Sequence, residues 1–419
     1  MKANRGGSFL AQHGRAIFVI GGISGLGILA SAGFQIVSIR GLGPQAFGLL
    51  ASFLALINIA SIGSGALRNS VAVATASGAS RETSAVASKR RMDSSLIEAL
   101  ALGAICTVGV LVVPWLGVGT GRESSDVIAL LFVAGTITPY FLFARAQGIL
   151  QGAGDPRSVI WWSTGAQIAQ LLLSIAVLLC GFGALGILSV LLVTAVIGAA
   201  GSSIQARRSS VRLSGRPFTV ESSVVLLLTI TFAWLTNMDV VLVRAGSPEN
   251  IAGAYAAAAV LIKTTLIVPA TLSLYLLPRF VSRKKDASMT KYGVNVTLAI
   301  TFLSGVAMFI IVSLAGGLIV PVFGPGYQSS LQLLPWLALA WLPWAMAQGL
   351  LIRLTASSSK LALVALVVVA IVQWIGSTAL LPDVLAMIAL NGILGFAALV
   401  VLFLVHLRSS KIDGRGVES

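Results

Sequence analysis

The stretch Val-Ser-Ile-Arg-Gly-Leu-Gly-Pro at residues 37–44 recurs as Val-Leu-Val-Arg-Ala-Gly-Ser-Pro at residues 241–248. A second echo links Ala-Gln-Gly-Ile-Leu at 146–150 with Ala-Gln-Gly-Leu-Leu at 347–351. The two offsets, 204 and 201 residues, are each close to half of the 419-residue chain. Apolar letters match easily by chance, whereas the shared Arg and Pro and the shared Ala-Gln-Gly do not. The pattern predicts a chain whose two halves repeat each other.

The composition is that of a membrane protein. Hydrophobic residues make up 57% of the chain and charged residues 10%, against about 25% charged in a soluble domain. The formal net charge is +15, but Lys and Arg stand in short clusters between apolar stretches, where they orient a membrane protein. We therefore expect no nucleic-acid partner.

The residues that carry most enzyme and metal chemistry are scarce. Cys106 and Cys180 lie in apolar stretches without metal-ligand spacing, and nothing supports a disulfide between them. His13 and His406 lie near opposite ends of the chain, so local spacing gives neither a zinc site nor a histidine-based triad. No Walker-type Gly-Lys-Ser/Thr sequence is present, which excludes a self-contained pump. We expect no catalytic residues, no metal site and no cofactor.

Twelve stretches are long and apolar enough to cross a bilayer, which takes about 20 residues. The first six are 16–39, 47–76, 94–118, 127–151, 159–180 and 184–204. The last six are 222–243, 251–277, 294–320, 331–352, 361–381 and 384–405. We expect an all-α polytopic membrane protein with a six-helix lobe at 16–204, a basic linker at 205–221 and a second six-helix lobe at 222–405. Short terminal segments, 1–15 and 406–419, complete the chain. Membrane proteins with repeated halves are mostly secondary transporters.

The loop charges agree with twelve crossings. Of the 28 Lys and Arg, 22 fall on the segments expected inside the cell, three on the outside segments and three within spans. Cytoplasmic loops carry the excess of Lys and Arg, so both termini are expected in the cytoplasm. The first span lacks a clear small-residue cleavage site and is expected to be retained.

Four charged residues fall inside the expected spans: Arg68, Arg145, Asp239 and Lys263. A charge at the bilayer centre costs about 2.5–3.5 kcal/mol on insertion scales, so such residues usually face protein or water. Three of the four are cationic, which suits an anionic substrate, especially a phosphate or pyrophosphate. Alternatively, Arg68 and Arg145 lie within about two turns of a helix end and can snorkel to the cytoplasmic head groups.

Lys263 falls about twelve residues into the eighth span and has no short route to either surface. Asp239, on the neighbouring span, is its obvious partner. The two residues form either a structural ion pair or a functional site. In the functional interpretation Lys263 contacts substrate, and Asp239 holds the lysine or binds a proton or cation. Neutral amides either line the same cavity or hold helices together. They are Gln35, Gln147, Asn237 and Gln348.

Residues 40–48, Arg-Gly-Leu-Gly-Pro-Gln-Ala-Phe-Gly, resemble the Arg-x-Leu-Gly-Pro-x-x-Phe-Gly signature of polysaccharide transporters. Four further segments are similar to parts of that family: 65–68, 147–152, 239–255 and 323–327. On these motifs the chain resembles the Wzx-type flippases of the multidrug/oligosaccharidyl-lipid/polysaccharide (MOP) exporter superfamily. That superfamily also holds multidrug and toxin extruders (MATE proteins) and lipid II flippases.

The resemblance implies two pseudo-symmetric, MATE-like six-helix bundles around a central cavity. It implies that the chain flips an undecaprenyl-pyrophosphate-linked oligosaccharide from the inner to the outer leaflet of the bacterial cell membrane, for cell-surface polysaccharide biosynthesis. The expected partners are that substrate and membrane lipids, and a glycan polymerase and other polysaccharide assembly proteins are compatible with this role. Arg68, Arg145 and Lys263 would hold the pyrophosphate. Arg40 and Arg244, at equivalent repeat positions, would flank the outer gate or anchor outer head groups.

Three alternatives are weighed against this expectation. Multidrug or cation antiporters share the twelve-helix plan, although their usual acidic residue in the first helix is absent and Gln35 is the most polar group there. Lipid II flippases usually have fourteen helices, and the twelve spans expected here count against that member of the superfamily. A membrane enzyme acting on the same glycans predicts a large outward loop, and the longest one expected here has about nine residues.

Overall fold

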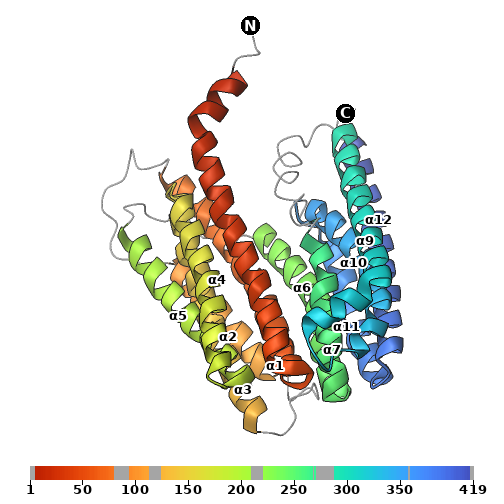
Figure 1. The fold of residues 1–419 in the computed structure, drawn as a ribbon. Helices are drawn as coiled ribbons and strands as arrows, with labels where there is room; N and C mark the ends of the chain where they lie inside the picture. Colours follow the sequence, from red (N-terminus) through yellow and green to blue (C-terminus); the bar gives the residue numbers. More distant parts are fainter. Residues whose placement is uncertain are drawn as a thin grey trace. The chain divides into compact units, whose positions relative to one another are not determined.

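The structure is a computed structural model that describes residues 5–79, 94–112, 124–208, 220–267, 269, 287–356 and 359–415. All secondary structure in these residues is helical (Figure 1). The first half contains α1 (Arg5–Ala79), α2 (Ser94–Val112), α3 (Ser124–Gly152), α4 (Pro156–Leu179) and α5 (Gly183–Arg208). The second half contains α6 (Val220–Gly246), α7 (Glu249–Lys263), α9 (Ala287–Phe323), α10 (Ser329–Ala356), α11 (Lys360–Leu380) and α12 (Val384–Arg415). Ten stretches of these helices are long and apolar enough to span a membrane. The expected all-α membrane fold is confirmed.

Helix α1 is two helices joined at Gly43. Gly43 has φ 70° and ψ 172°, outside the helical region, and Pro44 begins the second helix. Glycine adopts a positive φ at little cost, and proline fits a first helical turn because its missing N–H would be unpaired there anyway. The apolar stretch Gly22–Ala76 has 55 residues, more than twice the roughly 20 that one crossing needs. It therefore supplies the two spans expected at 16–39 and 47–76.

Helix α7 is shorter than the span expected at 251–277. It has 15 residues, ends at Lys263 and is followed by a 3₁₀ turn over Thr264–Leu266. The hydroxyls of Thr264 and Thr265 donate to the carbonyls of Leu261 and Ile262, at 2.7 and 2.8 Å. Such back-bonding by Thr competes with the regular helical hydrogen bonds and bends a helix. Beyond Ile267, most of the span expected at 251–277 lies outside the described residues. The basic cluster at 283–285, which follows that span, also lies outside them.

The chain forms two compact units, which are described separately. Unit 1 contains residues 1–41, 64–110 and 131–217, and unit 2 contains 42–63, 111–130 and 218–419. The start of the second helix within α1 therefore belongs to unit 2, and the rest of it to unit 1. The lobes expected at 16–204 and 222–405 were defined by the sequence repeat, whereas the two units are defined by contacts within the structure. The lobes stay a prediction.

In unit 1, α3 packs closely on the last part of α1. A Cβ added to Gly148 would lie 2.6 Å from the Arg68 carbonyl oxygen, and one added to Gly152 would lie 2.5 Å from the Ala72 carbonyl oxygen. Small residues four apart let membrane helices approach to backbone contact. This packing explains both glycines of the motif at 147–152.

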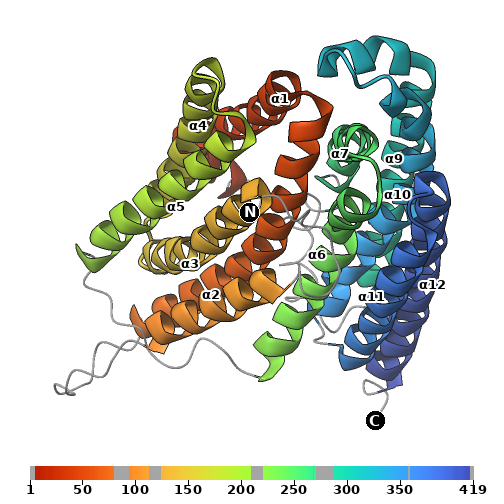
Figure 2. The same ribbon diagram turned by 90° about the horizontal axis from the view of Figure 1, so that it is seen from below.

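In unit 2, α10 packs against α7, α9 and α12, while α6 packs against α7 and α11 (Figure 2). The core around α10 is aromatic, since Trp341 and Trp344 are fully buried. The ring of Phe232 on α6 meets Trp344 edge-on, with centroids 6.1 Å apart. The Trp344 indole N–H donates to the Asn391 carbonyl of α12 at 3.0 Å. These contacts join α6, α10 and α12.

Candidate functional site

An ion pair lies inside unit 2, where α6 meets the end of α7. Lys263 Nζ lies 2.7 Å from Asp239 Oδ1. The Tyr255 hydroxyl donates to the other carboxylate oxygen, Oδ2, also at 2.7 Å. Tyr255 and Lys263 are eight residues apart on α7, about 12 Å along the helix axis. Two long side chains of one helix therefore hold both oxygens of a single carboxylate on the next helix.

The two members of the pair differ in exposure. The Asp239 side chain is fully buried, whereas 16% of the Lys263 side chain is exposed. Lys263 Nζ also lies 4.6 Å from the ring centroid of Trp341 on α10, a favourable cation–π position. The ammonium group is thus held by a carboxylate and an aromatic face, and part of the lysine side chain stays exposed.

Small residues let α7 come close to its neighbours. Six consecutive residues of this helix, 254–259, are fully buried, and all of them except Tyr255 are alanines. Tyr255 is the one bulky side chain in this run, and it is aimed at Asp239. A single tyrosine within an alanine run was the available sequence signal for this contact. Trp341 gave no such signal, because an aromatic residue in an apolar helix is ordinarily core.

A second polar cluster in unit 2 joins the two repeat-equivalent helix starts. Arg244 Nη2 lies 2.7 Å from Glu249 Oε1, and the Gln45 side-chain amide donates to Glu249 Oε2. We call these three residues the clasp. Gln45 and Glu249 directly follow Pro44 and Pro248 and are 204 residues apart, the offset of the repeat. Contact between equivalent positions is expected where two similar halves meet at a pseudo-two-fold axis.

The backbones also meet next to the clasp. A Cβ added to Gly253 would overlap the Pro44 carbonyl group, and one added to Gly48 would lie 3.0 Å from the Gly253 nitrogen. Glycine is therefore required at Gly253 by the close approach of a neighbouring main chain. The start of the second helix in α1 is seated directly on α7.

The clasp should depend on pH. Burial opposes the charge of Glu249, but hydrogen bonds from Arg244 and Gln45 and the positive charge of Arg244 outweigh it, so the pKa of Glu249 is lowered. An acid with a lowered folded pKa stabilises the fold above its unfolded pKa, about 4.3, and loses that contribution as pH falls through the folded value. We expect wild type to melt above Glu249→Gln at neutral pH, and the gap to close in acid. A gap that stays constant with pH would show that the Glu249 charge contributes nothing.

The two arginines expected at the outer gate differ in their surroundings. Arg244 is 12% exposed and bonded to Glu249. Arg40 belongs to unit 1 and is exposed. Sequence reasoning paired these residues by symmetry and missed Glu249 and Gln45, although the repeat offset pointed to both. A role of the arginines at a gate stays a prediction.

Arg68 and Arg145 lie at one seam of unit 1, between α1 and α3. Arg145 Nε donates to the Ser95 hydroxyl of α2 at 2.8 Å. The Nε of Arg68 is buried and has no hydrogen-bond partner among the described residues. Gly148, which contacts the Arg68 carbonyl, lies three residues after Arg145. The structure brings these two arginines to the same seam, and Lys263 belongs to the other unit.

The four amides occupy different surroundings. Gln147 donates to Ser163 on α4 at 2.9 Å, and Asn237 donates to the carbonyl of Ala233 on its own helix at 2.8 Å. In Gln35 and Gln348 the side-chain oxygen is buried without a hydrogen-bond partner in the part of the chain that is described. The helix-linking interpretation thus fits the contact of Gln147. A further buried amide contact, Gln373 Nε2 to Asn391 Oδ1 at 3.0 Å, was not anticipated.

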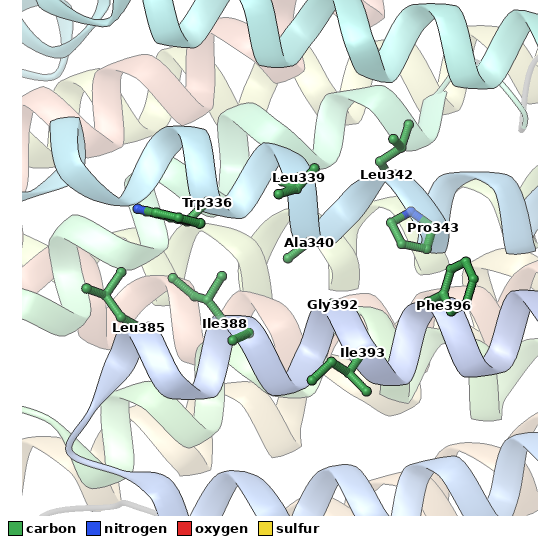
Figure 3. A pocket seen from close by; sticks show the side chains of 11 residues that line it. Trp336, Leu339, Ala340, Leu342, Pro343, Leu385, Ile388, Gly392, Ile393 and Phe396 are labelled. Atoms are coloured by element: carbon green, nitrogen blue, oxygen red, sulfur yellow. The ribbon is translucent and has the colours of Figure 1, made fainter.

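An apolar groove of about 680 Å³ lies between α10 and α12. In Figure 3, Trp336 faces Leu385 and Ile388 at one end, and Pro343 faces Phe396 at the other. A Cβ on Gly392 would lie 3.3 Å from the Ala340 Cα, so the two helices nearly touch at this point. None of the described side chains that line the groove is charged.

No group of three or more metal-ligating side chains occurs in the described residues. The sequence matches no protein-family model and no curated protein. The structure of this chain, by contrast, is similar to solved structures. One is the inward-facing conformation of a multidrug resistance MATE family transporter of the MOP superfamily, with a TM-score of 0.68 and 15% identity over 94% of this chain and 96% of that one. This chain has the fold of the MOP superfamily transporters.

Two further structures with the MOP fold are also similar. The lipid II flippase MurJ, in its inward closed conformation, has a TM-score of 0.57 and 13% identity over 91% of this chain and 87% of that one. A MOP superfamily transporter from Pyrococcus furiosus has a TM-score of 0.53 and 15% identity over 94% of each chain. These TM-scores establish the fold, and identities this low leave the substrate to be argued from the site.

Proposed function

We propose that this chain is a transporter, not an enzyme, that flips an undecaprenyl-pyrophosphate-linked oligosaccharide from the inner to the outer leaflet of a bacterial cell membrane. The observation that carries the proposal is Lys263. Its ammonium group lies within a membrane-spanning unit and is held by a buried carboxylate, and 16% of the lysine side chain is exposed. Membrane proteins keep such charges mostly where a substrate or ion passes.

The chemistry of the site suits an anionic lipid. Lysine binds phosphate oxygens through charge-assisted hydrogen bonds. Arg68 and Arg145, at one seam of unit 1, are two further cations inside expected spans. The groove between α10 and α12 suits a hydrocarbon chain, because the described side chains that line it are all uncharged. In this proposal the cations hold the pyrophosphate, Arg40 and Arg244 flank the outer gate, and six-helix lobes move around the site by alternating access. Both termini then face the cytoplasm.

A multidrug or cation antiporter is the second candidate. The observation that favours it is Asp239, a fully buried carboxylate that can bind a proton or a cation when Lys263 moves away. The likeness to a MATE family transporter, at a TM-score of 0.68, agrees with this alternative. The two candidates differ in the charge of the cargo, which is anionic for a flippase and cationic for an antiporter.

The test uses the full chain reconstituted into liposomes. A fluorescent polyprenyl-diphosphate oligosaccharide is placed in the outer leaflet, and its movement is scored as protection from a membrane-impermeant quencher. We expect wild type and Lys360→Met to move the lipid, because Lys360 is an exposed residue at the start of α11. We expect Lys263→Met to be at least about 30-fold slower, the loss usual for one partner of a buried charge contact.

Failure to move several such glycans, together with proton-coupled efflux of a cationic dye, would replace the flippase by the antiporter. Movement by Lys263→Met at the wild-type rate would remove the lysine from the substrate site. Protein-free liposomes set the background, and thermal melting of each variant in detergent shows that it is folded.

A further inference from the structure

We propose that the indole N–H of Trp341 is a second hydrogen-bond donor for the anionic head group that Lys263 binds. This inference rests on the proposed function, because it adds a residue of α10 to the binding site that Lys263 forms there. It places a neutral donor beside the cation and restricts the ligand to a group that accepts hydrogen bonds, such as a phosphate.

Trp341 carries a buried polar atom without a partner. The residue is fully buried, and its Nε1 has no hydrogen-bond partner among the described residues. Two other indoles of the chain do have one. Trp344 donates to the Asn391 carbonyl at 3.0 Å, and Trp162 donates to Gln205 Oε1 at 2.6 Å. A buried donor without a partner is costly and rare in folded proteins, so the N–H of Trp341 points to a group that binds there.

This N–H borders the cation of the site. Lys263 Nζ lies over the ring of Trp341, 4.6 Å from its centroid, and Nε1 is an atom at the edge of the same ring. Charge-assisted hydrogen bonds to phosphate are about 2.7–2.9 Å long, so bonds from Nζ and from Nε1 can end on the oxygens of one phosphate group. The face of the ring holds the ammonium, and its edge supplies the second donor.

A second donor matters because the ammonium already has an anionic partner. Asp239 Oδ1 lies 2.7 Å from Nζ and takes one of its three donors, and the pair as a whole carries no net charge. A phosphate that reaches Lys263 is therefore attracted less than it would be by a free lysine. The N–H of Trp341 is bonded to no described carboxylate, so its whole hydrogen bond is available to the ligand.

The chemistry of the N–H selects the kind of ligand. An indole nitrogen donates and does not accept, so this edge of Trp341 attracts phosphate oxygens and offers nothing to a cation. Lys263 covers one face of the ring, is 16% exposed and has a flexible stem. When it turns toward an incoming head group, that side of Trp341 opens to the same ligand.

The test uses the full-length protein in detergent, with tryptophan labelled by 15N in the indole ring and farnesyl diphosphate as the probe. The indole N–H signals are followed by NMR during the titration, and loss of one signal in Trp341→Phe identifies that of Trp341. Farnesol, which has the same tail and no phosphate, shows the effect of the tail alone. Affinities are measured by calorimetry. Trp161→Phe is the matched control, because Trp161 is exposed on α4 of unit 1.

We expect farnesyl diphosphate to move the Trp341 signal downfield, as a hydrogen bond to a charged oxygen does, and farnesol to leave it in place. Trp341→Phe should bind the diphosphate at least about tenfold more weakly than wild type and Trp161→Phe do, the loss usual for a hydrogen bond to a charged group. Its affinity for farnesol should equal that of wild type, because phenylalanine keeps an aromatic face and lacks only the N–H donor.

A Trp341 signal that stays in place while wild type binds the diphosphate would overturn the inference and leave the proposed function standing. An equal loss of affinity for diphosphate and farnesol in Trp341→Phe would also overturn it, because the tryptophan would then act by packing alone. Absence of diphosphate binding to wild type would contradict the proposed function itself. If Trp341→Phe fails to fold, single replacements of the other tryptophans identify the Trp341 signal by elimination, and the wild-type titration decides.

Discussion

Lys263→Met is expected to destabilise the protein by about 3–5 kcal/mol, the usual cost of removing one partner from a buried ion pair. Asp239 would remain fully buried, with the Tyr255 hydroxyl as its remaining hydrogen-bond partner among the described residues. The cost lies toward the lower end of the range, because the lysine side chain is partly exposed. The measurement is the free energy of unfolding in detergent, by denaturant titration of tryptophan fluorescence.

The double variant Asp239→Asn/Lys263→Met is expected to recover most of that loss. It has no buried charge, its asparagine oxygen still accepts from Tyr255, and its methionine can still pack on Trp341. Replacement of a buried ion pair by neutral groups of similar volume is often neutral in stability or better. A double variant as unstable as Lys263→Met alone would contradict this account, because the loss would then come from packing of the lysine and not from the stranded carboxylate.

Gly253→Val is expected to be the most damaging glycine substitution in unit 2. Its Cβ would overlap the Pro44 carbonyl group, and main chain cannot rotate away as a flexible side chain can. Overpacking of this kind typically costs about 1–3 kcal/mol, and relief requires the second helix of α1 to separate from α7. The measurement is the melting temperature in detergent, with disulfide yield in a Gln45→Cys/Glu249→Cys background as a readout of the clasp.

Gly317→Val is the matched control for that substitution. Gly317 lies in α9 of the same unit, and a Cβ there would meet no atom within 4 Å. Both variants carry the same change in helix propensity, so the difference between them isolates the contact with Pro44. Equal melting temperatures and equal disulfide yields would show that the helix starts are not held together as the structure has them.

Much of the fold could be predicted because membrane spans follow from apolar length and loop charge alone. The recurrence of residues 37–44 at 241–248 pointed to the two helix starts that contact each other in the structure. The Arg40–Gly48 motif also marked the break within α1, since Gly43 and Pro44 supply the positive φ and the helix start. The early end of α7 was not foreseen, because two adjacent threonines occur in many continuous helices.

The candidate site was only partly predictable. Charged residues are rare inside membrane spans, so two opposite charges on neighbouring spans have few other partners. Proximity of Lys263 and Asp239 could therefore be predicted, and the structure places Lys263 Nζ 2.7 Å from Asp239 Oδ1. Trp341 could not be singled out, because an aromatic residue in an apolar helix looks like ordinary core. Tyr255 could have been, since it is the one bulky residue in an alanine run. Which cations of unit 1 act with Lys263 does not follow from spacing along the chain, since helix rotation decides which face meets the substrate.

The most direct test of the central claim is the flipping rate of Asp239→Asn/Lys263→Met in liposomes, measured with the fluorescent polyprenyl-diphosphate oligosaccharide. This variant separates the functional role of the lysine from its structural role, because its fold is expected to be retained. If Lys263 holds the anionic head group, the folded double variant moves the lipid at least about 30-fold more slowly than wild type. A folded double variant that flips the lipid at the wild-type rate would show that the ion pair only holds helices together.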